Sequence, residues 1–397
     1  MGSGRTTHQL RKFRFERPQK IAAVLLLVLL GECLWVSTRR QLSETDYQFA
    51  RCGREIWERP SPLAGYFTTC GNIHDGTLAY RAAGLPLTLE RILTKQASST
   101  STWEMRLQAG EIKLLLRLPF MLAGLGLGAC LWWVTRRLFG NAGGYISLAL
   151  YCFMPEVVRA SIYPNNEILA AFGIFSTIYL AIGVAHALQG PPRKWRPRIV
   201  LLTAALGFTA TAHLAAFIVA LLFVVIFMAW VAEGRRAYIP TLLIIWVVGA
   251  FFLLFASYAF HPDAFSYVFR SAAGRMWFSL DGAKWFFRNP GNAAFTVAVV
   301  GSLGLYIALR RSRYFGNTAP LIVAATLMLL VTTGVQSEPW LWALPFLIAF
   351  AGGVFADALE MPGCKVFLWA TVVVLVAQAG LCLTELAVQM RSFPAMR

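Results

Sequence analysis

Apolar runs without charged residues alternate with short polar segments along most of the chain. Most of these runs have roughly 17–25 residues, which is about the length that a helix needs to cross a bilayer. The pattern therefore predicts an all-α fold, a polytopic transmembrane helical bundle. We expect about eleven transmembrane helices, at residues 21–37, 114–134, 142–162, 166–188, 199–213, 215–232, 239–260, 291–309, 318–335, 340–357 and 366–387.

The apolar stretch 199–232 has two interpretations. It is either one long helix or a hairpin of two short helices that turns near His213. A single helix would reverse the orientation of every later loop and place Arg310–Arg313 on the outer side. Because Lys and Arg gather on the cytoplasmic side of membrane proteins, the hairpin is the preferred interpretation.

Composition agrees with a membrane protein, since 57% of the residues are hydrophobic and only 14% are charged. The net charge of +17 is compatible with nucleic-acid binding, but the basic residues lie in short clusters between the apolar runs. This distribution follows the positive-inside bias and argues against a nucleic-acid partner. We expect a multi-pass protein of a bacterial inner membrane. Residues 1–20 form its basic cytoplasmic N-terminus, and 21–397 form one transmembrane domain.

Two longer polar segments, 38–113 and 261–290, fall on the predicted outer side. In the first, Asp46–Glu58 mixes apolar and charged residues and is expected to form an amphipathic helix at the membrane interface. The same loop contains Cys52 and Cys70, two of the seven cysteines. Two cysteines facing an oxidising compartment are a candidate disulfide, although chance could also place both of them there.

Ionisable groups near the outer ends of the helices are the first candidates for function, because burying such groups at membrane depth is costly. Six are expected to line one polar cavity beneath the first outer loop: Glu32, Asp46, Arg117, Arg159, Glu167 and His213. Each also has a plain structural interpretation. Glu32 could pair with Arg117 to neutralise both charges, and His213 could bond a backbone carbonyl. Asp46 could be an ordinary solvated loop carboxylate.

No Cys/His cluster with zinc-ligand spacing occurs in the sequence. We therefore expect no cofactor, and a divalent metal stays an open alternative.

Several short motifs along residues 40–215 together resemble a known superfamily. The motifs are Glu44-Thr45-Asp46-Tyr47, Arg117-Leu118-Pro119-Phe120, Arg136-Arg137-Leu138-Phe139-Gly140-Asn141-Ala142-Gly143-Gly144 and Tyr163-Pro164-Asn165-Asn166-Glu167. Their order and spacing resemble the GT-C glycosyltransferases that use polyprenyl-phosphate sugars, in the branch of the protein O-mannosyltransferases and aminoarabinose transferases. Pro339–Phe346 shows a weaker resemblance to a late segment of that family.

The resemblance implies a transferase that takes a sugar from a polyprenyl-phosphate donor within the lipid bilayer. Asp46 stands at the family's acidic position in the first outer loop, and this implies that it acts as the base. Tyr47 replaces a second acid, and His213 replaces a lysine that faces the lipid phosphate. The implied cations for the donor phosphate are Arg117, Arg159, His213, Arg270, Arg275 and Lys284. The implied substrate-binding residues are Tyr47, His74, Asp75 and Glu167.

Two other classes of function stay open. A relative that has lost catalysis would serve as a membrane subunit or a lipid-binding protein, and the replacements at Tyr47 and His213 fit that alternative. A transporter would be expected to contain paired repeats and helices broken near the midplane, and the sequence shows neither pattern.

Overall fold

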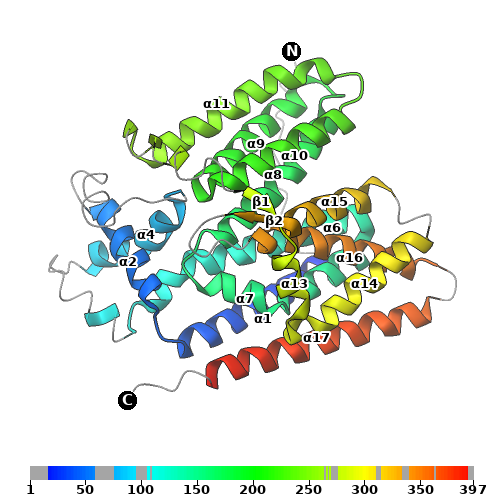
Figure 1. Ribbon diagram of the computed structural model, residues 1–397, viewed down its shortest axis with the longest axis horizontal. Helices are drawn as coiled ribbons and strands as arrows, with labels where there is room; N and C mark the ends of the chain where they lie inside the picture. Colours follow the sequence, from blue (N-terminus) through cyan, green and yellow to red (C-terminus); the bar gives the residue numbers. More distant parts are fainter. Residues whose placement is uncertain are drawn as a thin grey trace, which may run out of the picture.

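The computed structural model describes residues 17–58, 76–94, 105–107, 110–262, 265–266, 268–269, 276–309, 314–332, 339–361 and 364–391. In these residues the chain is almost entirely helical (Figure 1). The helices are α1 (Arg17–Arg39), α2 (Glu44–Glu58), α4 (Leu78–Thr94), α6 (Lys113–Cys152), α7 (Pro155–Ile162), α8 (Glu167–Ala187), α9 (Pro192–Ala212), α10 (Leu214–Val231), η1 (Arg236–Tyr238), α11 (Ile239–Ser257), α13 (Asp281–Arg288), η2 (Pro290–Asn292), α14 (Ala293–Ala308), α15 (Phe315–Leu329), α16 (Pro339–Leu359) and α17 (Lys365–Arg391).

The predicted all-α class is confirmed, with one small addition. Strand β1 (Met276–Phe278) pairs antiparallel with β2 (Leu330–Thr332), so that Trp277 lies opposite Val331. This short ribbon joins the segment that follows α11 to the end of α15. It brings the second predicted outer segment against the bundle.

Helix α6 is two helical arms joined at Gly140, whose φ of 72° breaks the helix. A left-handed φ of this kind suits glycine, which has no Cβ. The second arm folds back on the first, because Tyr151 donates a hydrogen bond of 2.7 Å to the Gly124 carbonyl. A Cβ on Gly144 would meet the Arg136 side chain. The first arm contains the helix predicted at 114–134, whereas the helix predicted at 142–162 is interrupted at Phe153 and Met154 and continues as α7.

Helices α9 and α10 meet at His213, whose extended backbone (φ −157°, ψ 120°) interrupts the helix. The two helices then pack on each other, and α9 also packs on α8 and α11 (Figure 1). The hairpin interpretation of 199–232 is therefore confirmed.

Eight of the described helices are long and apolar enough to cross a membrane, judged by length and composition. The folded-back arm of α6, the charged α9 and the short α15 account for the difference from the predicted number. The number of eleven crossings thus stays a prediction.

Helix α16 lies at the centre of the bundle, where every residue of its most apolar 18-residue stretch is buried. It packs against α6, α8, α14 and α15. In contrast, only 17% of the residues in the corresponding stretch of α17, and 22% in that of α11, are buried. Apolar surfaces of this extent on a soluble protein would mark an interaction site, and here they suit contact with lipid.

Helices α2 and α4 lie at one end of the bundle, to the left in Figure 1, and pack closely together. The contact requires glycine on both helices, because a Cβ on Gly53 or Gly84 would overlap the backbone of the other helix. Arg81 of α4 also donates two hydrogen bonds, of 3.0 and 2.7 Å, to the Ser257 carbonyl at the end of α11. The helix predicted at Asp46–Glu58 is confirmed as α2, and its position at a membrane interface stays a prediction.

Cys52 of α2 is disulfide-bonded, whereas Cys33, Cys130, Cys152, Cys364 and Cys382 are free thiols. Cys70 lies outside the described residues, so its pairing with Cys52 stays a prediction. A bridge closing this roughly 18-residue loop would stabilise the fold by about 3 kcal/mol in the chain-entropy model. Thiol labelling of the denatured, unreduced protein should find five free cysteines, and seven would refute the bridge.

The charge bias predicts a cytoplasmic N-terminus and an outer C-terminus. Reporter fusions after Arg198, Arg236 and Arg313 should all report the cytoplasmic side, because each site follows or lies within a basic cluster. A periplasmic signal from the Arg236 fusion would contradict the predicted orientation of α9 and α10.

Candidate functional site

Two adjoining cavities lie among the start of α2, helix α7, helix α13 and the end of α17. Cavity I has a volume of about 510 Å³ and is lined by Arg40, Ser43, Thr45, Asp46, Glu156, Arg159, Ala160, Tyr163, Pro164, Asn165, Glu167, Trp285, Trp340, Leu341 and Gln389. Cavity II has a volume of about 600 Å³ and is lined by Arg159, Asp281, Lys284, Trp285, Arg288, Asn289 and Glu385. Arg159 and Trp285 line both cavities and so mark the boundary between them.

Asp46 is held at the wall of cavity I by the start of α2. Its Oδ2 accepts hydrogen bonds from the Ser43 backbone N–H (3.2 Å) and from Arg117 Nη2 (3.0 Å). The Asp46 N–H in turn donates to Ser43 Oγ, which completes a reciprocal capping box. The side chain is only 1% exposed, so the interpretation as a solvated loop carboxylate is wrong. Among the described residues these bonds engage Oδ2 alone, which leaves Oδ1 to accept a proton.

Arg117 is fully buried and does not line either cavity. Besides Asp46, its guanidinium donates to the carbonyls of Ser37, Arg40 and Gln41, at distances of 3.0–3.4 Å. Cationic side chains commonly satisfy the last carbonyls of a helix in this way. Arg117 therefore stabilises the turn between α1 and α2, and so the position of Asp46 at the start of α2.

Glu32 lines neither cavity, contrary to the expectation, and it does not form the alternative pair with Arg117. Both of its carboxylate oxygens are buried without a hydrogen-bond partner among the described residues. The reason is the capping box at Ser43, which brings Asp46 to Arg117 in its place.

Arg159 projects from α7 to the boundary between the cavities. Its Nη2 lies 2.9 Å from Glu156 Oε1 and 3.9 Å from Glu385 Oε1, and its guanidinium lies over the Trp285 ring at 5.9 Å. Lys284 also lines cavity II, where it lies 3.7 Å from Asp281. The structure thus places two of the predicted phosphate-binding cations at one cavity.

Glu167 lines cavity I from the first turn of α8. Asn165 Oδ1 accepts from the N–H groups of Glu167 and Ile168, so it caps this helix. Glu167 Oε2 accepts a short hydrogen bond of 2.6 Å from Trp342 Nε1. His213 packs edge-on against the same Trp342 ring at 4.9 Å. His213 itself lines neither cavity, so the expected convergence of His213 with Asp46 is not found.

Tyr47 follows Asp46 on α2 and is half-buried. Burial, together with the negative charge of Asp46, raises the pKa of the Tyr47 phenol above its ordinary value. Tyr47 is therefore a neutral hydroxyl at neutral pH. Four further predicted site residues lie outside the described residues: His74, Asp75, Arg270 and Arg275.

Comparison with known proteins identifies the fold. A family model described as dolichyl-phosphate-mannose-protein mannosyltransferase matches residues 105–261. The apo structure of ArnT from Cupriavidus metallidurans superposes with a TM-score of 0.59 at 15% identity, over 85% of this chain and 59% of that one. An oligosaccharyltransferase from Archaeoglobus fulgidus, in complex with Zn and sulfate, superposes with a TM-score of 0.57 at 13% identity, over 92% of this chain and 53% of that one. The chain has the GT-C fold.

A second structure of ArnT with this GT-C fold, bound to undecaprenyl phosphate, superposes with a TM-score of 0.58 at 15% identity. It covers 94% of this chain and 72% of the ArnT chain. No curated protein matches the sequence. This chain spans 59% of the length of the apo ArnT chain and shares its fold at low sequence identity.

Two acids that line the cavities, Glu156 and Glu385, are not among the site residues predicted from the sequence. Both lie inside the apolar runs predicted as transmembrane helices, at 142–162 and 366–387. The rule that ionisable groups at membrane depth are functional candidates would have found them. Their uncharged partners Asn289 and Asn292 are not ionisable, so the same rule would not have found them.

In the part of the chain that the structure describes, no group of three or more His, Cys, Asp or Glu residues is arranged to hold a metal ion. The expectation of no cofactor stays a prediction.

Proposed function

We propose that the chain is a glycosyltransferase that moves a sugar from a polyprenyl-phosphate donor to an acceptor at the outer face of a bacterial inner membrane. The single observation that carries the proposal is the pair of adjoining cavities in a GT-C fold. One cavity presents the carboxylate of Asp46, and the other presents the cations Arg159, Lys284 and Arg288.

Cavity II suits the phosphate of the donor. Arg and Lys side chains bind phosphate oxygens through charge-assisted hydrogen bonds and stabilise the charge that develops on a leaving phosphate. Strand β1 and the residue before α13 expose large apolar side chains, with Phe278 at 69% and Leu280 at 57%. Such residues beside basic ones are typical of a membrane interface, where a lipid tail enters. The undecaprenyl phosphate bound by ArnT supports this class of donor.

Cavity I suits the acceptor. In the proposed step, Asp46 takes the proton from an acceptor hydroxyl or amine as that atom attacks the anomeric carbon. The bond between the anomeric carbon and the phosphate oxygen breaks, and the polyprenyl phosphate leaves with the bonding electron pair. Glu167, which Trp342 orients, is proposed to bind a hydroxyl of the sugar or of the acceptor.

The proposal is tested with purified protein in proteoliposomes that contain undecaprenyl-phosphate sugars, each labelled in the sugar. Transfer is expected to release undecaprenyl phosphate and to label a product that forms only with the protein present. Binding of the donor without release would favour the alternative of a non-catalytic membrane subunit or lipid-binding protein. Sugar that crosses the vesicle membrane unchanged would instead indicate a transporter.

A further inference from the structure

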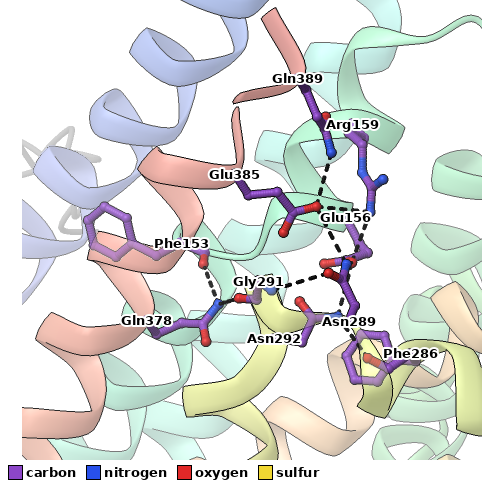
Figure 2. Close-up of polar contacts among 10 residues, drawn as sticks. All are labelled: Phe153, Glu156, Arg159, Phe286, Asn289, Gly291, Asn292, Gln378, Glu385 and Gln389. Atoms are coloured by element: carbon purple, nitrogen blue, oxygen red, sulfur yellow. Dashed lines mark hydrogen bonds and ion pairs between the residues drawn. The ribbon is translucent and has the colours of Figure 1, made fainter. Parts of the chain in front are cut away.

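A cluster of carboxylates and amides joins α7, the turn before α14, and α17, next to the two cavities (Figure 2). Its carboxylates are Glu156 and Glu385, and its amides are those of Asn289, Asn292, Gln378 and Gln389. None of these six residues is part of the donor or acceptor roles assigned above.

Glu156 is the centre of this cluster. Its Oε1 accepts three hydrogen bonds, from Arg159 Nη2 at 2.9 Å, Asn289 Nδ2 at 2.8 Å and Asn292 Nδ2 at 3.0 Å (Figure 2). Glu156 is 2% exposed and Asn292 is fully buried. Breaking one of these contacts would leave a buried charge poorly compensated, which is costly. The contacts therefore hold the Glu156 carboxylate in place.

Glu385 lies near the same guanidinium nitrogen, Arg159 Nη2, as Glu156 does. Its Oε1 lies 3.9 Å from Arg159 Nη2 and accepts from Gln389 Nε2 at 3.0 Å and from Asn289 Nδ2 at 3.4 Å. A Cβ on Gly291 would overlap Glu385 Oε2, so the turn before α14 needs glycine to admit this carboxylate. The contact of Glu385 with Arg159 is longer than that of Glu156.

Arg159 is the cation that lines both cavities, and its position depends on these contacts. A long, flexible side chain at the edge of a cavity gains precision only when its rotamer is fixed by packing and by hydrogen bonds from behind. Glu156 supplies the shortest such contact, and Trp285 covers the guanidinium.

We propose that Glu156 is a positioning residue that fixes the Arg159 guanidinium at the boundary between the cavities, with Glu385 as a weaker second contact. The ligand that Arg159 meets there, the donor phosphate, rests on the proposed function. The positioning itself rests only on the contacts of the described residues.

The first test needs no ligand. Phenylglyoxal modifies accessible arginines, and mass spectrometry gives the rate at each site. Glu156→Gln is expected to raise the rate at Arg159 about tenfold, the effect of losing one hydrogen bond to a charged group. Arg288, which lines cavity II without a described contact to Glu156, is the internal control and should keep its rate. An unchanged rate at Arg159, or an equal rise at both arginines, would overturn the proposal. Should Glu156→Gln fail to fold, Glu385→Gln is expected to raise the Arg159 rate about twofold, and no rise would count against the proposal in the same way.

The second test is a double-mutant cycle on the binding of undecaprenyl phosphate in detergent. Glu156→Gln is expected to weaken binding about tenfold in the wild-type background and to have no further effect when Arg159 is already glutamine. Equal losses in both backgrounds would show that Glu156 does not act through Arg159. A wild-type protein that does not bind undecaprenyl phosphate would refute the proposed donor, and the modification rates alone would then decide the positioning.

Discussion

Replacing Asp46 with asparagine is expected to lower sugar transfer by at least about 10²-fold, the loss typical of removing a general base. Asparagine keeps the size of the side chain and an acceptor oxygen, but it cannot take a proton from the acceptor. Because Asp46 is also the buried counter-ion of Arg117, the variant should lose stability by about 3–5 kcal/mol. Transfer per folded molecule in proteoliposomes and the midpoint of unfolding in detergent measure the two effects separately.

Glu58→Gln is the matched control for this experiment. Glu58 lies on the same helix, α2, and forms an ion pair with Arg54 at 2.7 Å, but it lines neither cavity. The control should lose stability and retain near-normal transfer per folded molecule. Near-normal transfer by the Asp46→Asn variant would remove Asp46 from the mechanism. Equal losses of transfer in both variants would assign the effect to a damaged α2.

Replacing Arg117 with glutamine is expected to destabilise the fold by about 3–5 kcal/mol, because it leaves the Asp46 carboxylate buried without its charge partner. The change also removes the bonds to the carbonyls of Ser37, Arg40 and Gln41. Chemical denaturation in detergent, followed by tryptophan fluorescence, gives the free energy of unfolding.

Arg106→Gln is the matched control for the second prediction. Arg106 also forms two ion pairs, with Glu90 and Glu111, but its side chain is 25% exposed. Exposed pairs contribute about 0–1 kcal/mol, so this control should change the free energy of unfolding little. A similar small effect from Arg117→Gln would contradict the role assigned to Arg117 in fixing the α1–α2 turn.

The order of helices along the chain was predictable because apolar runs and breaks are local signals. The hairpin at His213 followed from the distribution of Lys and Arg, and the structure has the break at that residue. The short β1–β2 ribbon was not predictable, since its two strands are far apart in the sequence and each has only three residues. The sequence predicts two helices on either side of Gly140. It does not show how tightly the chain turns there, because the turn depends on the positive φ of Gly140.

The site was predictable in part. Asp46, Arg159 and Glu167 line the cavities, as expected for charges at the outer ends of helices, and Lys284, predicted as a phosphate-binding cation, lines cavity II. The partner of Arg117 was not predictable, because the choice between Glu32 and Asp46 depends on the capping box that turns α2 toward α6. His213 packs against Trp342, which bonds the cavity residue Glu167, and spacing along the chain does not encode this packing.

A structure of the protein with undecaprenyl phosphate, determined by electron cryomicroscopy in lipid nanodiscs, would test the proposed donor site directly. We expect the phosphate in cavity II, within hydrogen-bond distance of Arg159 or Lys284, with the lipid tail leaving across β1 and α13. A phosphate bound away from both cavities, for example at the opposite end of the bundle near Arg235, would contradict it.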